Sequence, residues 1–186
     1  MARPKKNDGD ARARLVEAAG RTFRVGGFGG TGVDGLAKEA GLTSGAFYAH
    51  FDSKADAFRL AVADGLSFLR NGILKFQEEY GRNWREPFID FYLGPRMEVA
   101  LNEACGLPSF SSDVARADGA TRALYEAELE SLVEALAGGL RGAHARERAL
   151  ALLAILSGAA AMARAVKDES MRREILAAAN AAAKAI

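Results

Sequence analysis

The stretch VDGLAKEAGLTSGAFYAHF, residues 33–51, predicts two short helices joined by a tight turn at Gly41. Its apolar residues recur at spacings of three and four, which packs the two helices against each other. These residues are Leu36, Ala37, Ala40, Leu42, Phe47 and Phe51. Along the outer face of the second helix, small residues come first and hydrogen-bonding residues follow. A helix of this kind fits the ~12 Å wide major groove of DNA, its slim end near the bases and its polar side chains near the phosphates.

With three further residues, this stretch resembles the tetracycline-repressor (TetR) family of bacterial regulators. The family pattern I-A-x-x-A-G-V-S-x-G-x-F-Y-x-H-F-x-x-K is nearly complete in LAKEAGLTSGAFYAHFDSK, residues 36–54. The match is specific over about 45 residues that include the preceding helix, whereas the remainder is similar only in its layout of helices. The resemblance implies an all-α fold of about nine helices, a dimer formed by the last two helices, and a ligand cavity among the middle ones.

The resemblance also implies which residues contact double-stranded operator DNA. The start of the second helix would lie nearest the bases, two later side chains and a lysine would bind phosphates, and a threonine would offer its hydroxyl to the DNA backbone. In that order they are Thr43, Ser44, Gly45 and Ala46, then Tyr48, His50 and Lys54, and finally Thr31. Because Ser44 and Ala46 are small, we expect sequence specificity to depend substantially on DNA shape and backbone fit.

The helices around this stretch are predicted from spacing and capping signals. A first helix runs from about residue 10 to 25 and ends at Gly26-Gly27, and Thr31 with Asp34 predicts a capping box before the next. Either Thr43 or Ser44 caps the helix that follows, while Ser53 and Asp56 open a long helix that ends at residue 79 or 80.

Beyond the long helix, the Gly94-Pro95 pair predicts a break. We expect a short helix near residues 97–104, a loop over 106–112, and helices over about 113–137, 145–166 and 169–185. Gly65 and Gly72 lie inside the long helix, where a bend or a close contact is expected. The domains predicted from this layout are a helix-turn-helix domain over residues 1–53 and an effector-binding and dimerisation domain over residues 54–186.

Composition restricts the other classes of protein to which this sequence could belong. Residues 1–60 hold 10 basic and 7 acidic side chains, a net charge of +3, whereas residues 61–186 hold 15 and 17, a net charge of −2. The positive amino-terminal third suits a polyanion. One cysteine and two histidines exclude an internal disulfide and are too few for a zinc site, so we expect no metal and no cofactor.

The chain is expected in the cytoplasm. Its start, Met-Ala-Arg-Pro-Lys-Lys, lacks the apolar core of a signal peptide. Its longest uncharged run, residues 149–163, reaches as a helix only about 22 Å of the ~30 Å that a bilayer requires, so no membrane span is expected. The basic segment from Arg3 to Lys6 is either an arm that enters a neighbouring DNA groove or a solvated tail.

The middle of the chain is rich in aromatic residues. Ordinary core packing explains most of them, but some are expected to line a site for a small hydrophobic or aromatic effector. The candidates are Phe76, Tyr80, Trp84, Phe88, Phe91, Tyr92, Phe110 and Tyr125. Nearby, Arg96, Glu98 and Glu103 could pair with a charged effector, although a solvated helix face is the simpler interpretation.

The favoured function is a regulator, most simply a repressor, that a small molecule releases from its operator. One alternative is a helical DNA-binding protein without an effector. Another is an enzyme with a helical substrate cavity, which the sequence supports poorly because no nucleophile has an evident base, so no catalytic residues are assigned. Cys105 is interpreted as an inert small side chain, and not as an oxidation sensor.

Overall fold

The computed structural model describes residues 8–186, so the predicted amino-terminal arm, Arg3 to Lys6, lies outside the described residues. Within that range the chain forms nine α-helices and no strands. In chain order the elements are α1 (Asp8–Gly30), α2 (Val33–Glu39), α3 (Ser44–Tyr48), α4 (Lys54–Tyr80), the 3₁₀ turn η2 (Gly81–Asn83), α5 (Arg85–Leu93), the 3₁₀ turns η3 (Pro95–Met97) and η4 (Leu101–Glu103), α6 (Gly106–Ala115), α7 (Gly119–Gly139), α8 (Ala145–Ala165) and α9 (Glu169–Ala185).

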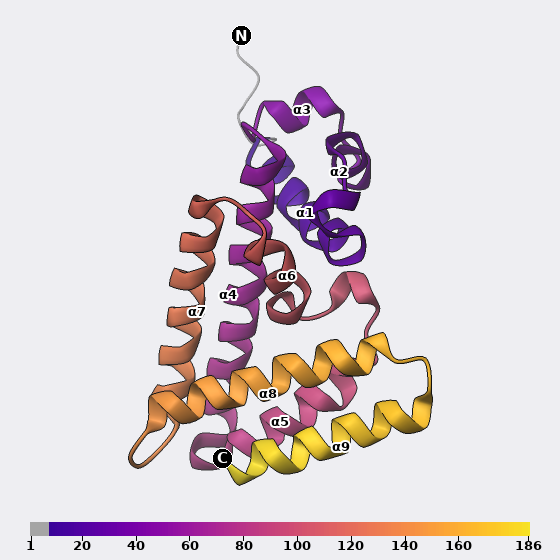
Figure 1. Ribbon diagram of the computed structural model, residues 1–186. Coiled ribbons are helices and arrows are strands. Elements are labelled where there is room, and N and C mark those ends of the chain that lie inside the picture. Colours follow the sequence, from indigo (N-terminus) through magenta and orange to yellow (C-terminus); the bar gives the residue numbers. More distant parts are fainter. Residues whose placement is uncertain (1–7) are drawn as a thin grey trace.

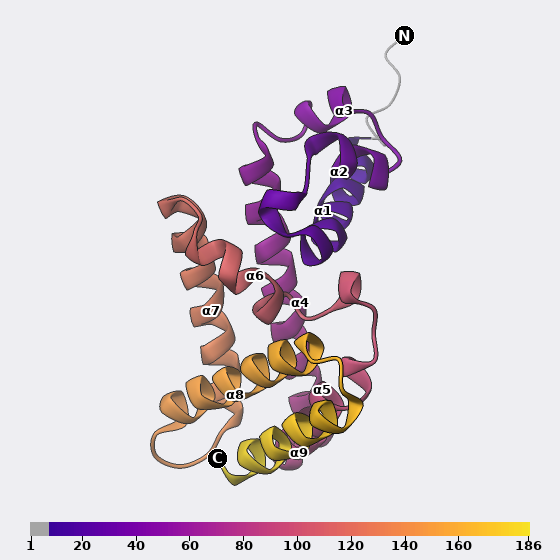
Figure 2. The same cartoon turned by 45° about the vertical axis from the view of Figure 1, so that its right-hand side comes forward.

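Helix α4 is the long element that joins the two ends of the molecule. Helices α1–α3 gather around its amino-terminal end, whereas α5, α8 and α9 lie at the other end (Figures 1 and 2). Ser53 caps α4 by accepting a hydrogen bond from the Asp56 amide, 3.1 Å away, and the helix ends at Tyr80, as predicted. One continuous rod therefore connects the predicted DNA-reading end to the aromatic-rich end.

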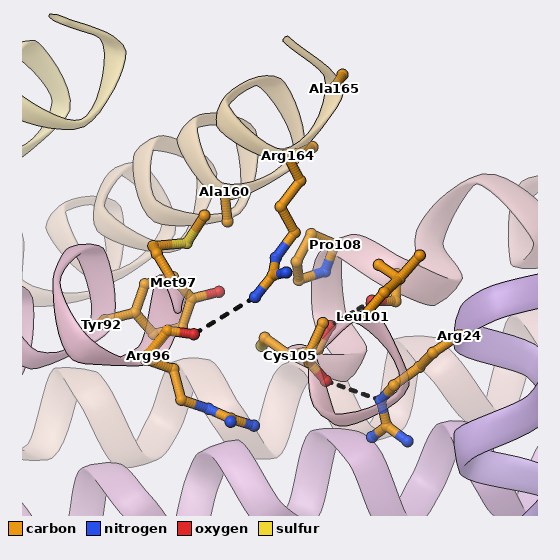
Figure 3. A pocket seen from close by; sticks show the side chains of 13 residues that line it. Arg24, Tyr92, Arg96, Met97, Leu101, Cys105, Pro108, Ala160, Arg164 and Ala165 are labelled. Carbon is orange, nitrogen blue, oxygen red and sulfur yellow. Dashed lines mark hydrogen bonds between the residues drawn. The ribbon is translucent and has the colours of Figure 1, made fainter. Parts of the chain in front are cut away.

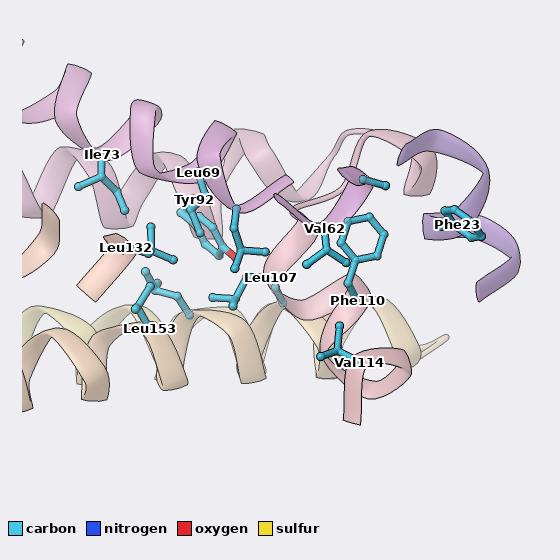
Figure 4. Close-up of a cluster of buried hydrophobic side chains, with 14 of the residues drawn as sticks. Phe23, Val62, Leu69, Ile73, Tyr92, Leu107, Phe110, Val114, Leu132 and Leu153 are labelled. Atoms are coloured by element: carbon cyan, nitrogen blue, oxygen red, sulfur yellow. The ribbon is translucent and has the colours of Figure 1, made fainter. Parts of the chain in front are cut away.

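The core follows this rod along its buried face. Val62, Leu69 and Ile73 of α4 pack with Phe110 of α6 and Leu132 of α7, with α8 adding a further buried layer (Figure 4). Burying each of these large side chains contributes about 1.5–3 kcal/mol, so this cluster fixes α6 and α7 against α4.

The predicted end of the first helix is confirmed at Gly27. This residue adopts φ +65°, ψ 175°, a conformation that side chains rarely tolerate, and α1 is sharply kinked there. A short helical turn continues to Gly30. In it the Phe28 amide donates a 2.9 Å hydrogen bond to the Asp113 carboxylate of α6, so the kink is tied to the other part of the molecule.

Two sequence predictions for the middle of the chain are wrong. The stretch near residues 97–104 forms only the two 3₁₀ turns η3 and η4, and the predicted loop over residues 106–112 is the first part of α6. Pro108 does not prevent this helix because it sits in its first turn, where backbone N–H groups have no partner inside the helix. The predicted helix over 113–137 is also broken, since Asp118 caps a separate α7 by accepting from the Thr121 amide.

The last two helices match their predictions closely, and α8 and α9 lie side by side (Figure 1).

Among the described residues α8 is the one helix long and apolar enough to cross a membrane by length and composition. Such a helix is weak support for a span, because the core helices of many proteins have the same composition. Here its inner face packs in the core through Leu152, Leu156 and Ala160.

Candidate nucleic-acid interface and internal cavity

Helices α2 and α3 form the predicted helix-turn-helix. Gly41 makes the turn with φ +66°, and the buried side chains Leu36, Phe47 and Phe51 hold the two helices together. Thr43, not Ser44, caps α3, its hydroxyl oxygen accepting from the Ala46 amide 3.2 Å away. Local sequence therefore fixes both the angle and the start of the second helix.

The exposed face of α3 carries most of the predicted DNA contacts. Thr43 and Gly45 are exposed, and Tyr48 is 61% exposed although it lies next to the buried Phe47. Ala46 and His50 are half-buried, and His50 follows the end of the helix instead of lying inside it. Helix α3 lies at the end of the molecule farthest from α9 (Figure 2), where a DNA duplex has access to it.

Ser44 interacts with Asp34 of α2. Its hydroxyl donates to the Asp34 carboxylate, which is exposed in the first turn of that helix. The hydroxyl proton is thus used inside the protein, and Ser44 offers a base edge only its acceptor lone pairs. Direct readout by α3 is correspondingly sparse, in keeping with the expected dependence on DNA shape.

The predicted capping role of Thr31 is wrong. Gly32 occupies the cap position of α2 and provides no side-chain hydrogen bond. Thr31 is 4% exposed, and its hydroxyl donates to the Gly27 carbonyl 2.8 Å away. This burial removes the surface that a contact with the DNA backbone would use. Thr31 therefore stabilises the kink of α1.

Lys54 also has a structural role that the sequence did not indicate. Its Nζ donates to the carbonyls of Phe28 at 2.9 Å and Thr31 at 3.0 Å, and lies 4.3 Å from the centre of the Phe28 ring. The ammonium therefore holds the segment between α1 and α2 with two of its three donors.

A cavity of about 240 Å³ lies where α1, α5, the two 3₁₀ turns, α6 and α8 meet. Figure 3 shows Arg24, Arg96 and Arg164 entering this region from three different elements, with Cys105 among them. Its other walls are mainly apolar, formed by side chains such as Met97 and Pro108 and by the alanines of α8. The sequence did not single out Arg24 or Arg164, which lie far apart along the chain.

The predicted effector-binding aromatic residues divide into two groups. Tyr92 lines the cavity, and with Phe76, Phe88 and Phe91 it also lines a smaller adjoining cavity of about 50 Å³. The other four lie outside both cavities: Trp84 and Phe110 are buried in the core, Tyr80 stacks on Phe76, and the Tyr125 hydroxyl is 2.9 Å from that of Ser111. Trp84 and Tyr125 also line two other surface hollows, one between η2, α5 and the start of α8 and one between α6 and α7.

Cys105 lies in the cavity wall. Burial raises the pKa of its thiol, and hydrogen bonds from Tyr92 and the Leu107 backbone, together with the positive charges of Arg96 and Arg24, offset that effect only in part. A raised pKa keeps the sulfur in its less reactive protonated form, which favours the interpretation of Cys105 as inert. Within residues 8–186 no group of three or more His, Cys, Asp or Glu side chains is arranged to hold a metal ion.

The geometry places the chain among helix-turn-helix regulators in which a reading head is joined to a helical body. Comparison with known proteins gives a match in the helix-turn-helix region. Residues 15–61 match the family model described as "Bacterial regulatory proteins, tetR family". This stretch, from α1 to the first part of α4, is thus similar to the DNA-binding region of the tetR family of transcriptional regulators.

Solved structures show the same fold over nearly the whole chain. NemR of Escherichia coli in its reduced form is 19% identical with a TM-score of 0.81, covering 95% of this chain and 96% of its own. A TetR-family regulator of Agrobacterium tumefaciens is 18% identical, with a TM-score of 0.74 and coverage of 91% and 97%. FadR of Bacillus subtilis in complex with stearoyl-CoA is 12% identical, with a TM-score of 0.66 and coverage of 90% and 96%. No curated protein sequence matches this chain.

Proposed function

We propose that this regulator is a dimeric, cytoplasmic repressor that leaves its operator when a small molecule binds in the cavity beside Arg24. The proposed DNA-binding domain is residues 1–53 and the proposed effector and dimer domain is residues 54–186. The observation that carries the proposal is that Arg24 belongs to α1 of the DNA-binding domain and yet lines a cavity built by the other domain. The proposed function involves no catalysis.

The proposed DNA contacts come from α3 and the turn after it. Thr43, Ser44, Gly45 and Ala46 would approach the base edges, and Tyr48 and His50 would bind phosphates. Thr31 and Lys54 are left out because their polar atoms hold the segment between α1 and α2. Contacts with the phosphates position the protein, while the few base contacts give part of its specificity.

The proposed dimer forms through the outer faces of α8 and α9. Met162 is 57% exposed on α8 and Met171 is 53% exposed on α9, and the residues between them along both faces are mostly alanine, with Gly158 in the middle of α8. Small side chains allow two helix pairs to approach closely, and covering such a face removes apolar surface from water. Two helix pairs would form a four-helix bundle related by a twofold axis.

In the proposed dimer, the two helix-turn-helix units have one arrangement that fits DNA and another that does not. Release from the operator requires an effector that binds these two arrangements with different affinity, because equal affinity would leave the equilibrium between them unchanged. Helix α4 connects the cavity region with the helix-turn-helix and would carry the change. FadR, which has this fold, is described in complex with stearoyl-CoA, which supports an apolar or aromatic ligand for the fold but does not identify the effector here.

The first test is binding of the purified protein to duplex DNA from immediately upstream of its own gene, with a random duplex as control, over a series of salt concentrations. We expect specific binding about 10³-fold tighter, with a log-log salt slope of roughly −4 to −7 from about four to eight neutralised phosphates. Equal binding of both duplexes would direct the search to other operators. Failure to bind either duplex at low salt would contradict the assignment of a DNA-binding regulator.

A further inference from the structure

We propose that the cavity recognises an organic anion, specifically a small carboxylate with an apolar body, through Arg24, Arg96 and Arg164. This inference rests on the proposed function only in calling the ligand an effector. Recognition of the carboxylate itself follows from the cavity.

The first observation is uncompensated positive charge. Three guanidinium groups line the cavity, and no Asp or Glu is among the described residues that line it or the smaller cavity beside it. Within residues 8–186 none of the three forms an ion pair within 4.0 Å, and the carboxylates that attract them, Asp64 for Arg24 and Glu98 for Arg164, act only at longer range. Buried or half-buried charges are normally paired, so this set lacks a partner of opposite charge.

The second observation is unused hydrogen-bonding capacity. Arg24 Nε donates to the Ala104 carbonyl at 2.8 Å, Arg96 donates to the Glu103 carbonyl at 2.6 Å, and Arg164 donates to the carbonyls of Val99 at 3.2 Å and Arg96 at 3.4 Å. Each guanidinium therefore uses one or two of its five N–H donors on the backbone, which fixes its position and leaves donors for a ligand. Planar, charged donors of this kind match a carboxylate in bidentate geometry.

The third observation is a buried polar atom with only a weak partner. Tyr92 lines both cavities, and the neighbour of its buried hydroxyl is the thiol of Cys105, a weak hydrogen-bonding group. A ligand oxygen would offer this hydroxyl a stronger acceptor. Burial lowers the pKa of Arg24 and Arg164, with smaller contributions from repulsion by Arg96 and, for Arg164, by Arg172; a bound anion would act in the opposite direction.

The size and walls of the cavity limit the rest of the ligand. Its volume of about 240 Å³ exceeds the ~150 Å³ of a cavity that holds benzene and is below the ~300 Å³ at which sites for drug-sized molecules begin. Met97, Pro108 and the alanines of α8 form apolar walls. The ligand is therefore a single ring or a short chain attached to the carboxylate.

Arg24 connects this recognition to DNA binding. It lies on α1, three residues before the kink at Gly27, and its guanidinium sits 5.0 Å from the centre of the Phe110 ring of α6. A carboxylate that draws Arg24 toward Arg96 and Arg164 acts directly on the helix that supports α2 and α3. The charge in the cavity and the position of α2 and α3 are thus coupled through the side chain of Arg24.

The test compares a carboxylate with a neutral ligand of the same shape. Titration calorimetry of the full chain would use 3-phenylpropanoate against 3-phenylpropanamide, and hexanoate against hexanamide, so that both a ring and a chain are sampled. We expect the carboxylate of at least one pair to bind roughly tenfold or more tighter than its amide, since hydrogen bonds to charged groups each contribute about this factor. Arg96→Gln and Arg164→Gln, on two different elements, should each remove that advantage while amide binding is unchanged.

Arg122→Gln, an exposed arginine on α7, is the matched control and should bind like the unaltered protein. Circular dichroism checks that each variant is folded, and Arg164→Lys, which keeps the charge but not the planar fork, should retain part of the advantage. Equal or tighter binding of the amides, or no binding of either carboxylate at millimolar concentration, would overturn the inference. A carboxylate that binds as expected but does not release operator DNA would leave recognition standing and contradict the proposed effector control.

Discussion

At the residue scale, the helix-turn-helix depends on side chains that bind its own backbone as much as on those that face outward. Thr31, Lys54 and Arg14 all donate to carbonyls at the ends of α1 and α2, Arg14 reaching that of Ala40. These bonds satisfy backbone acceptors that a helix end leaves without partners. The outward face of α3 is left with few long side chains, of which Tyr48 is the most exposed.

Removing the Tyr48 hydroxyl should weaken operator binding without affecting the fold. Tyr48→Phe loses one neutral hydrogen bond to a phosphate, worth about 0.5–1.5 kcal/mol, so we expect a roughly two- to tenfold loss of affinity by fluorescence anisotropy. Tyr125→Phe, whose hydroxyl contacts Ser111 inside the body, is the control and should bind normally. Unchanged affinity in Tyr48→Phe would exclude this hydroxyl from the interface.

Replacing Lys54 should reduce the stability of the protein before it affects DNA contacts. Lys54→Met keeps the chain length but loses two charged hydrogen bonds and the contact with Phe28, so we expect a loss of about 2 kcal/mol or more in the free energy of unfolding. Urea denaturation measures it, with Lys38→Met, exposed on α2, as control. If Lys54→Met weakened DNA binding at unaltered stability, the lysine would be a phosphate contact after all.

At the element scale, α6 is the connection between the cavity, the rod α4 and the kinked end of α1. Its first residue, Gly106, packs against Gly65 of α4, and its Asp113 accepts from the Phe28 amide of α1. The two glycines allow the helices to approach so closely that a Cβ built on Gly65 lies 3.2 Å from the Gly106 Cα. Of the bend or close contact predicted for Gly65 and Gly72, the close contact is confirmed at Gly65, whereas space is open around Gly72.

The two glycines of α4 should therefore respond oppositely to the same substitution. Gly65→Ala places a Cβ 3.0 Å from Phe110 Cε2, and such overpacking costs about 1–3 kcal/mol of stability. Gly72→Ala meets no atom within 4 Å and should stabilise the helix by about 0.5–1 kcal/mol. Chemical denaturation of the two variants checks this, and similar changes in both would contradict the close packing of α6 on α4.

At the scale of the whole molecule, the proposed function requires two copies. The outer faces of α8 and α9, on which Met162 and Met171 are exposed among alanines, lie at the end opposite α3 (Figure 1), so a twofold axis there would leave both α3 helices accessible to DNA. Gly158 lies at the middle of this surface with no atom within 4 Å of an added Cβ, which makes it a site where a large side chain is compatible with the single chain.

Gly158→Arg should give a folded monomer that binds operator poorly. Loss of the second reading head removes the bivalent advantage, and we expect affinity to fall about a hundredfold or more. Sedimentation velocity measures the oligomeric state, and Gly138→Arg on α7, equally open, should remain a dimer. A dimeric Gly158→Arg variant would place the interface elsewhere.

The sequence by itself determined the features that depend on neighbours along the chain. The helix-turn-helix, its Gly41 turn, the capping of α4 by Ser53 and the span of α9 all follow from spacings of a few residues, because propensity, capping and apolar periodicity act within one or two turns. The fold class and the resemblance to the family followed from the same local pattern.

Only the tertiary structure decided the features that depend on distant segments. The stretch from residue 106 to 112 is helical because Leu107 and Phe110 bury against α4, although its proline, serines and glycine suggested a loop. Arg24, Arg96 and Arg164 meet in one cavity although up to 140 positions separate them, and no local pattern carries that information. Packing in three dimensions brought their charges together, and it also gave Lys54 a role in supporting the backbone that the sequence did not indicate.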